Sequence, residues 1–197
     1  MNSVYEFGVR TLEIAGLGSA LQALRLPFGK EARSVVNTNY AINPNSTANG
    51  ETWDAFSFKQ DILLHPKDKE LIETLVKRGD EHSKVLRGVM VWCEINAPRY
   101  WWVEMDTYRV GAERLSSEST MHIQGKGMPE EELVEFKEHL EEGHMQKRVW
   151  MFSYQTLRRI YFQRRNHRLP QWRTFCGWIE TLPLSQEFIT YDSRRVE

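Results

Sequence analysis

The most basic stretch of the chain lies between residues 158 and 168. It holds one histidine and five arginines, namely Arg158, Arg159, Arg164, Arg165 and Arg168. Guanidinium groups bind phosphate through charge-assisted hydrogen bonds, so this stretch could hold a nucleotide phosphate or a nucleic-acid backbone. On a helix the five side chains cannot all point the same way. Some must face solvent, which is the ordinary role of such a cluster, and one or two are free to face a pocket.

A serine-rich segment, SSEST at residues 116–120, places hydroxyl groups beside Glu118 and His122. Hydroxyls and backbone N–H groups of a polar loop can bind phosphate, and an acid near a histidine can move a proton. The same residue types are equally ordinary in turns and helix caps. The segment is therefore a candidate binding loop whose chemistry the residues alone leave open.

The stretch RYWWVEMDTYR, residues 99–109, combines three adjacent aromatics with two acids and two arginines. It suits either a buried core segment or a site for a planar, charged ligand. On a helix, Trp101, Met105 and Tyr108 fall on one face, which is predicted to be core. Trp102 points to a different side of the same helix.

Periodicity predicts the elements that position these residues. Helices are predicted at residues 14–27, 65–79, 98–109, 129–143, 153–166 and 169–183. Residues 89–95 alternate and predict a strand with one face in the core. Leu133, Phe136 and Leu140 are the expected buried side of the acidic helix at 129–143. Because helices dominate and strands are few, the fold class is predicted to be α+β.

Two segments lack a helical or strand pattern. Residues 37–52 are dense in Asn, Ser, Thr, Gly and Pro, which predicts a long polar loop. The tail after about residue 183 is expected to be peripheral. The chain as a whole is predicted to be one domain, residues 1–197.

Composition excludes several classes of protein. The net charge of −1 provides no global attraction to nucleic acid or membrane. Cys93 and Cys176 do not have metal-ligand spacing, so we predict no metal site and two buried thiols in a reducing compartment. No run approaches the length of a membrane span, and the N-terminus lacks a signal-peptide pattern. The expected location is the cytoplasm.

The order of the segments resembles that of a known family. KRGDEHSKVLRGVMVWCEINAP leads from a helix through a strand into a helix, and SYQTLRRIYFQRRNHRLPQW follows later. This succession is similar to the flavin-dependent thymidylate synthases over roughly residues 67–180. The resemblance implies that family's fold, with helices packed on a small antiparallel sheet.

The resemblance also implies roles for individual residues. His82 and Arg109 match positions that bind the flavin cofactor. The positions that match substrate contacts are Glu104, Ser117 and Arg164, or Arg165 if the loop gap lies earlier. Trp172 matches a tryptophan that follows the C-terminal arginine.

The chain departs from the family at its identifying motifs. Only Arg109 is retained from the Arg-His-Arg motif, because Thr107 and Tyr108 occupy the first two positions. Ser119 stands where the family has the arginine that holds the nucleotide phosphate. A changed pyrimidine substrate is one consequence of these departures.

The implied activity is methylation of dUMP, or a related C5 modification of a pyrimidine deoxynucleotide. FAD is the implied cofactor, with NADPH and methylenetetrahydrofolate as co-substrates, in a homotetramer with sites at subunit junctions. The implied partner is a pyrimidine nucleotide, and no membrane is expected. One alternative is a non-catalytic nucleotide- or nucleic-acid-binding protein on the same fold. A further alternative is a viral interaction protein, because RYWW and RNHRLPQW also resemble segments of phage proteins.

Overall fold

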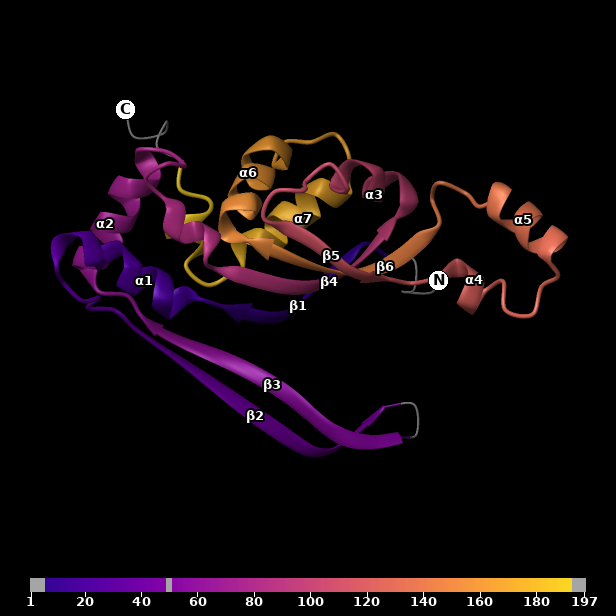
Figure 1. Cartoon of the computed structure of the whole chain (residues 1–197), viewed down its shortest axis with the longest axis horizontal. Coiled ribbons are helices and arrows are strands. Elements are labelled where there is room, and N and C mark those ends of the chain that lie inside the picture. The colour runs from indigo at the N-terminus through magenta and orange to yellow at the C-terminus, as the bar shows by residue number, and fades with distance from the viewer. Residues whose placement is uncertain (1–5, 49–50, 193–197) are drawn as a thin grey trace.

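A four-stranded antiparallel sheet forms the centre of the molecule (Figure 1). The computed structural model describes residues 6–48 and 51–192, with side chains for 6–39 and 60–192. The strands, in spatial order, are β1 (Gly8–Ala15), β4 (Met90–Pro98), β6 (Met145–Ser153) and β5 (Ala112–Ser117). Each pair of neighbours is antiparallel. β1 and β5 are therefore the edges of the sheet.

Helices cover one face of this sheet and both of its ends. The longer ones are α1 (Leu17–Arg25), α2 (Pro66–Lys77), α5 (Glu130–Glu138), α6 (Tyr154–Arg164) and α7 (Pro170–Glu180). The shorter ones are α3 (Arg99–Met105), α4 (Thr120–Ile123) and α8 (Ser185–Phe188), with 3-10 turns η2 (Leu26–Phe28) and η3 (Lys84–Arg87). In Figure 1, α3, α6 and α7 lie over the same face of the sheet. The predicted α+β class, with helices packed on a small antiparallel sheet, is confirmed.

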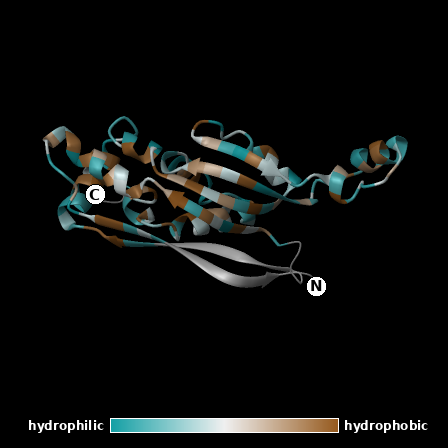
Figure 2. Ribbon diagram, turned by 60° about the horizontal axis from the view of Figure 1, so that its bottom comes forward, coloured by the Kyte–Doolittle hydropathy of each residue, from teal (hydrophilic) through white to brown (hydrophobic). Residues whose placement is uncertain are grey.

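The core forms where the alternating face of β4 meets the apolar face of α7. Val91, Cys93 and Ile95 are fully buried on β4, and the alternation is visible along the sheet in Figure 2. The predicted apolar face of α7, consisting of Trp172, Phe175, Cys176 and Ile179, is buried as well. Each such side chain contributes roughly 1.5–3 kcal/mol through burial. Both cysteines are free and buried, as predicted.

The local signals at helix ends behave as the sequence predicts. α2 begins at Pro66, and Gly79 just beyond its end has a φ of 96°. α6 begins after Ser153, whose hydroxyl accepts the Thr156 N–H. α1 ends before Pro27. The Ser153 cap thus sets where α6 and its arginines start.

The prediction of a polar loop at 37–52 is wrong. Residues 37–48 lie in β2 (Val35–Ala48), which pairs with β3 (Glu51–Leu63) from Val35↔Leu63 to Ala48↔Glu51. A partner strand satisfies the backbone groups of β2 whatever its side chains are, so polar composition did not prevent pairing. Pro44 falls in the register shift between Asn43 and Ser46, where a missing N–H is tolerated. The hairpin extends away from the sheet in Figures 1 and 2.

The expectation of a peripheral tail after residue 183 is wrong for residues 184–192, while residues 193–197 lie outside the described residues. Phe188 and Ile189 are fully buried, and Phe188 packs edge-on against Tyr154 at 6.4 Å. The Tyr154 hydroxyl donates to the Pro183 carbonyl at 2.7 Å. Two adjacent large apolar residues are enough to draw this segment, including α8, into the core.

Trp101 and Met105 of α3 are fully buried on the predicted core face. Trp102, on a different side of the helix, is 1% exposed and therefore also buried. Its Nε1 donates to the carbonyls of Ala97 and Gln146, and its ring stacks on Trp150 at 6.2 Å. Apolar residues of α7 and of β6 therefore pack on two sides of α3. The sequence of its seven residues does not predict burial on both sides.

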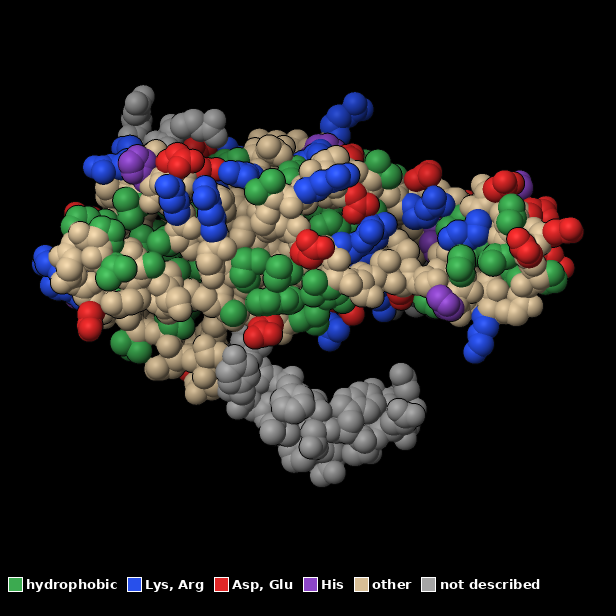
Figure 3. Space-filling view, viewed as in Figure 1, with side chains coloured by type: hydrophobic (Ala, Val, Ile, Leu, Met, Phe, Trp, Pro, Cys, Tyr) green, Lys and Arg blue, Asp and Glu red, His purple; other side chains and the backbone are tan. Residues whose placement is uncertain are grey.

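An arm comprising residues 118–144, with α4 and α5, projects from the end of the sheet (Figure 1). Its predicted buried residues, Leu133, Phe136 and Leu140, are only half-buried. Acidic side chains gather at the tip and hydrophobic ones remain exposed among them (Figure 3). At its base, Glu118 N–H donates to the Lys147 carbonyl at 2.9 Å. The arm is therefore a long connection between two strand ends that pair with each other.

Within residues 6–48 and 51–192, no helix has the length and apolar character needed to cross a membrane.

Candidate functional site

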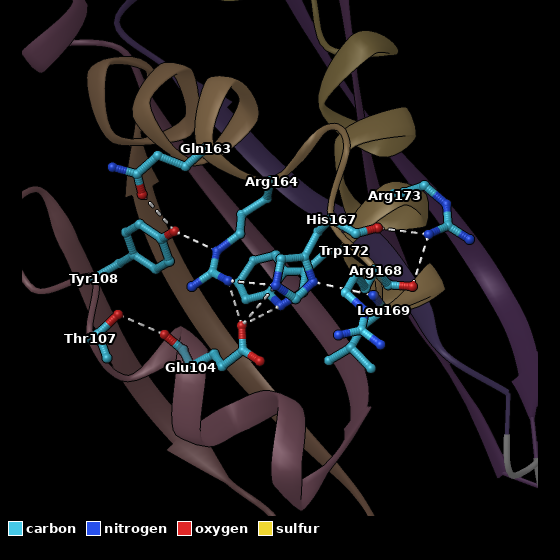
Figure 4. A network of polar contacts seen from close by, with 10 residues as sticks. All are labelled: Glu104, Thr107, Tyr108, Gln163, Arg164, His167, Arg168, Leu169, Trp172 and Arg173. Atoms are coloured by element: carbon cyan, nitrogen blue, oxygen red, sulfur yellow. Dashed lines mark hydrogen bonds and ion pairs between the residues drawn. The ribbon is translucent and has the colours of Figure 1, made fainter.

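A polar network joins the end of α6 to α3 (Figure 4). Arg164 Nη1 lies 2.5 Å from Glu104 Oε2, and Trp172 Nε1 donates to the same oxygen at 3.0 Å. The Arg164 guanidinium also lies 4.6 Å from the centre of the Trp172 ring. Two of the residues matched to substrate contacts are therefore brought together, from positions 60 apart in the sequence.

Two further residues complete the network. The Tyr108 hydroxyl accepts from Arg164 Nε at 2.8 Å and donates to Gln163 Oε1 at 2.8 Å. His167 Nδ1 accepts the Leu169 N–H at 3.3 Å, and its Nε2 lies 3.6 Å from Glu104 Oε2. His167 Nε2 also lies 3.0 Å from Arg164 Nη1, so the imidazole contacts both members of the Glu104–Arg164 pair. The sequence predicts that Tyr108 lies in the core and His167 in a charged cluster. No local pattern predicts that the two residues join this network.

Arg165, the alternative to Arg164, faces elsewhere. Its Nη2 lies 3.0 Å from Asp192 Oδ2, and its guanidinium lies 4.8 Å from the centre of the Phe162 ring. One residue along a helix turns a side chain by about 100°, so adjacent arginines cannot share a site. Arg164 is the one that meets Glu104.

Most of the predicted basic stretch is tied to the chain's own carbonyl and carboxylate groups. Arg158 donates to the carbonyls of Ile189 and Tyr191, and Arg159 pairs with Asp80 at 2.8 Å. With Arg164 and Arg165 also engaged, these arginines stabilise contacts between elements. They do not form a free basic face of the kind that nucleic acid requires.

A cavity of about 430 Å³ lies at the edge of the sheet beside Arg109. It is lined by Asp106, Tyr108, Arg109, Ala112, Glu113, Arg114 and Trp150. Arg109 is exposed, and its Nε donates to the Asp106 carbonyl at 3.4 Å. Trp150 is 4% exposed, and its Nε1 has no hydrogen-bond partner in the part of the chain that the structure describes. The cavity thus contains two cations, two carboxylates and one unpaired buried donor.

Asp106 links this cavity to a second one. Arg148 Nη1 lies 3.1 and 3.0 Å from the two Asp106 carboxylate oxygens, and Arg114 Nη1 lies 3.8 Å from one of them. Arg148 sits 4.4 Å from the centre of the Trp102 ring. Burial lowers the pKa of the Arg148 guanidinium, and the hydrogen bond to Asp106 opposes that change. Sequence reasoning missed Asp106, Arg114 and Arg148, since they lie on three separate elements.

The second cavity, of about 380 Å³, contains Ser117. It is lined by Glu94, Ser116, Ser117, Glu118, Lys147, Arg148 and Val149. Ser117 on β5 is the register partner of Arg148 on β6. The structure therefore places the predicted serine beside a cation that no motif indicated.

Other candidates have structural roles or lie apart. The Ser119 hydroxyl accepts the His122 N–H at 3.3 Å and caps α4, and the Thr107 hydroxyl donates to the Glu104 carbonyl at 2.7 Å. Glu118 Oε2 accepts the Lys147 N–H at 2.8 Å. His82 is exposed in the turn after α2 and lines neither of the two cavities.

Comparison with solved structures identifies the architecture. A structure of thymidylate synthase X (ThyX) from Helicobacter pylori with FAD and dUMP matches with a TM-score of 0.62 at 15% identity, over 95% of this chain and 99% of that one. The chain has the fold of ThyX. A second structure of the H. pylori ThyX, complexed with FAD and dUMP, matches with a TM-score of 0.59 at 15% identity, over 94% and 98% of the two chains. No protein-family model matches this chain, and no curated protein matches its sequence.

Proposed function

We propose that the protein is a divergent ThyX-like enzyme that acts on a pyrimidine deoxynucleotide, by methylation of dUMP or a related modification at C5. The observation that carries the proposal is the whole-length ThyX fold, found in structures solved with FAD and dUMP. The convergence of Glu104 and Arg164, matched independently to substrate contacts, supports it. Since a fold alone does not fix a function, the residues of the site must carry the rest of the argument.

In this proposal the flavin lies at the first cavity, because Arg109, the residue matched to the flavin, lines it. The carboxylates of Asp106 and Glu113 line the same cavity. When bound, the flavin would supply the redox chemistry, with NADPH as reductant and methylenetetrahydrofolate as carbon source. The residues of the chain would bind and orient these molecules. In this proposal Arg109 binds the flavin. His82 would contact the flavin only if a partner subunit brought the two together.

The Glu104–Arg164 pair suits the edge of a pyrimidine. A uracil ring presents carbonyl oxygens that accept from a guanidinium and an N–H that donates to a carboxylate. Arg164 would bind a base carbonyl and Glu104 the adjacent N–H. Ser117 would contact the nucleotide from the second cavity. Arg165 has no place in this assignment, because it is paired with Asp192.

The cysteines support a reaction that uses no thiol nucleophile. Burial raises the pKa of Cys176 to about 12 and that of Cys93 further still. A nucleophilic cysteine must be a thiolate near neutral pH. Transfer of a carbon to the base without a covalent cysteine intermediate is consistent with both values.

We propose a homotetramer with active sites at subunit junctions, by analogy with the family. In such an assembly a neighbouring subunit would close the open cavities at the β5 edge. Light scattering on the purified protein measures this directly, and a monomer at working concentration would contradict it.

The decisive test is the visible absorbance spectrum of the protein, purified without added cofactor and again after addition of FAD. A bound-flavin spectrum, followed by a spectral change on adding dUMP, supports the enzyme. Arg164→Met should abolish the response to dUMP and leave the flavin spectrum in place, while Arg159→Met should change neither. A protein that does not bind added FAD contradicts the proposal.

A second candidate is a non-catalytic nucleotide-binding protein on the same fold. It is favoured by the structural use of Thr107 and Ser119 at positions where the family has motif arginines. In that case dUMP would bind with unchanged affinity whether or not FAD is present, and no C5 modification would follow.

A further inference from the structure

We propose that Arg114 and Arg148, which share the carboxylate of Asp106, form the binding site for the phosphate group of the nucleotide. The inference rests on the proposed function and deepens it. It assigns a role to residues that the resemblance leaves without one, and it supplies the cation that Ser119 lacks.

Three guanidinium groups lie around Asp106. Arg148 and Arg114 lie 3.0 and 3.8 Å from its carboxylate, and Arg109 donates to its carbonyl at 3.4 Å. The linings of the two cavities balance in charge, because Glu113, Glu94 and Glu118 lie among these cations and Lys147. The case for phosphate therefore rests on guanidinium donors placed close together, since such donors bind phosphate through charge-assisted hydrogen bonds.

Arg148 is fixed before any ligand arrives. Its side chain is 11% exposed, its Nε donates to Gln146 Oε1 at 3.0 Å, and its guanidinium lies against the Trp102 ring. A cation that is already ordered loses little rotamer freedom when it binds. Arg114 is half-exposed and can move to meet a ligand from the other side of Asp106.

Two neutral donors lie beside the arginines. Ser117 is the register partner of Arg148, and paired side chains on neighbouring strands are about 4.5–5.5 Å apart at Cβ. Trp150 Nε1 is buried without a partner in the described chain and lines the cavity that holds Arg114. A buried donor is unfavourable until an acceptor reaches it, and phosphate oxygens are strong acceptors.

The neighbouring loop does not offer a competing site. The Ser119 hydroxyl caps α4, and the Glu118 carboxylate points back to the Lys147 N–H. An anion placed on this loop would meet a carboxylate and an occupied hydroxyl. The cations nearest to Ser117 are on β5 and β6.

The test compares ligands with and without the phosphate by calorimetry. The wild-type protein should bind dUMP at least about tenfold more tightly than deoxyuridine, since each charge-assisted hydrogen bond has such an effect. Arg148→Met and Arg114→Met should each weaken dUMP by about tenfold and leave deoxyuridine unchanged. Arg159→Met is the matched control, because Arg159 is an arginine on α6 that is paired with Asp80 and lines neither of the two cavities. Variants that keep the full preference for dUMP overturn the proposal.

Asp106→Asn provides a test in the opposite direction. It removes the carboxylate that competes for both arginines, so affinity for dUMP should rise severalfold. A merely structural salt bridge would give no gain, and unchanged or weaker binding by a folded variant counts against the site. Thermal unfolding of each variant establishes that it is folded.

One more ligand pair and one single ligand separate the possible sources of phosphate. If Arg148→Met weakens FAD relative to riboflavin and leaves dUMP unaffected, the site belongs to the cofactor and the assignment to the nucleotide is wrong. Inorganic phosphate, followed by tryptophan fluorescence through Trp102 and Trp150, requires neither ligand. If the wild type binds neither FAD nor dUMP, the proposed function fails. A phosphate response that Arg148→Met removes would still uphold the anion site, and no response would overturn it.

Discussion

Arg164 Nη1 lies 2.5 Å from Glu104 Oε2, although the two residues are 60 positions apart. The guanidinium that a pyrimidine would contact is therefore already paired with a carboxylate of the same chain. A base that binds here must exchange places with one partner of the pair or fit against both.

Glu104→Gln tests the effect of this pairing on substrate binding. The amide keeps the shape of the side chain and removes its charge, so Arg164 is held less tightly. We expect the affinity for dUMP to rise severalfold in a calorimetric titration. A fall in affinity would mean that the carboxylate itself receives a donor from the base.

Tyr108→Phe removes a hydroxyl that bridges Arg164 and Gln163. We expect a loss of about 1 kcal/mol in the free energy of unfolding, measured in urea. Tyr161→Phe is the matched control, since it also removes one hydroxyl, from a bond to Glu180 at the surface. Equal losses in the two variants would contradict a special role for the Tyr108 bridge.

Asp68→Asn tests a buried carboxylate that ties α2 to the segment after η2. Burial acts to raise the pKa of Asp68, but hydrogen bonds from Ser34, Arg25 and the Arg33 amide outweigh it and lower the pKa to about 2. Because this pKa lies below that of the unfolded chain, the carboxylate stabilises the protein at neutral pH. The lowered pKa corresponds to about 2 kcal/mol, which is lost as the pH falls from about 5 towards 2.

We therefore expect Asp68→Asn to reduce the free energy of unfolding by about 2 kcal/mol or more at pH 7. The difference between the variant and the wild type should shrink as the pH approaches 2. Urea unfolding at several pH values measures both. A constant difference across this range would show that the carboxylate charge is not what stabilises the contact.

Gly16→Ala tests the close approach of the start of α1 to Gly88, which follows η3. Gly16 has a φ of 90°, and a Cβ there would lie 2.0 Å from the Gly88 carbonyl oxygen. We expect a loss of about 3 kcal/mol or more in the free energy of unfolding. Gly29→Ala is the control, since its φ is also positive but open space surrounds it. It should lose only about 1 kcal/mol, from backbone strain alone.

Periodic apolar residues allowed much of the fold to be predicted. The core faces of β4 and α7 follow from spacings of two and of three to four residues, because burial on one side imposes them. Residues 37–48 lack such a signal, since β2 is held by backbone pairing with β3. Phe188 and Ile189 form too short an apolar pair to predict their burial.

The site was predictable only where the resemblance supplied a position. Glu104 and Arg164 were found in that way, and the register of α6 then separates Arg164 from Arg165. Asp106, Arg114 and Arg148 carry no local pattern, because an ion pair between elements depends on tertiary structure. His82 and Arg109 remain predicted cofactor contacts, and Ser117 a predicted substrate contact.

The arm between β5 and β6 begins and ends at the same place. Glu118 N–H donates to the Lys147 carbonyl, and Gln146 Nε2 donates to the Glu118 carbonyl at 2.6 Å. The entropy cost of closing a loop grows only slowly with its length. The stability of the sheet therefore depends little on how many residues lie between these ends. The arm is thus the natural place for relatives to differ in length. It is equally a permissive position at which a reporter peptide can be inserted without disturbing the sheet.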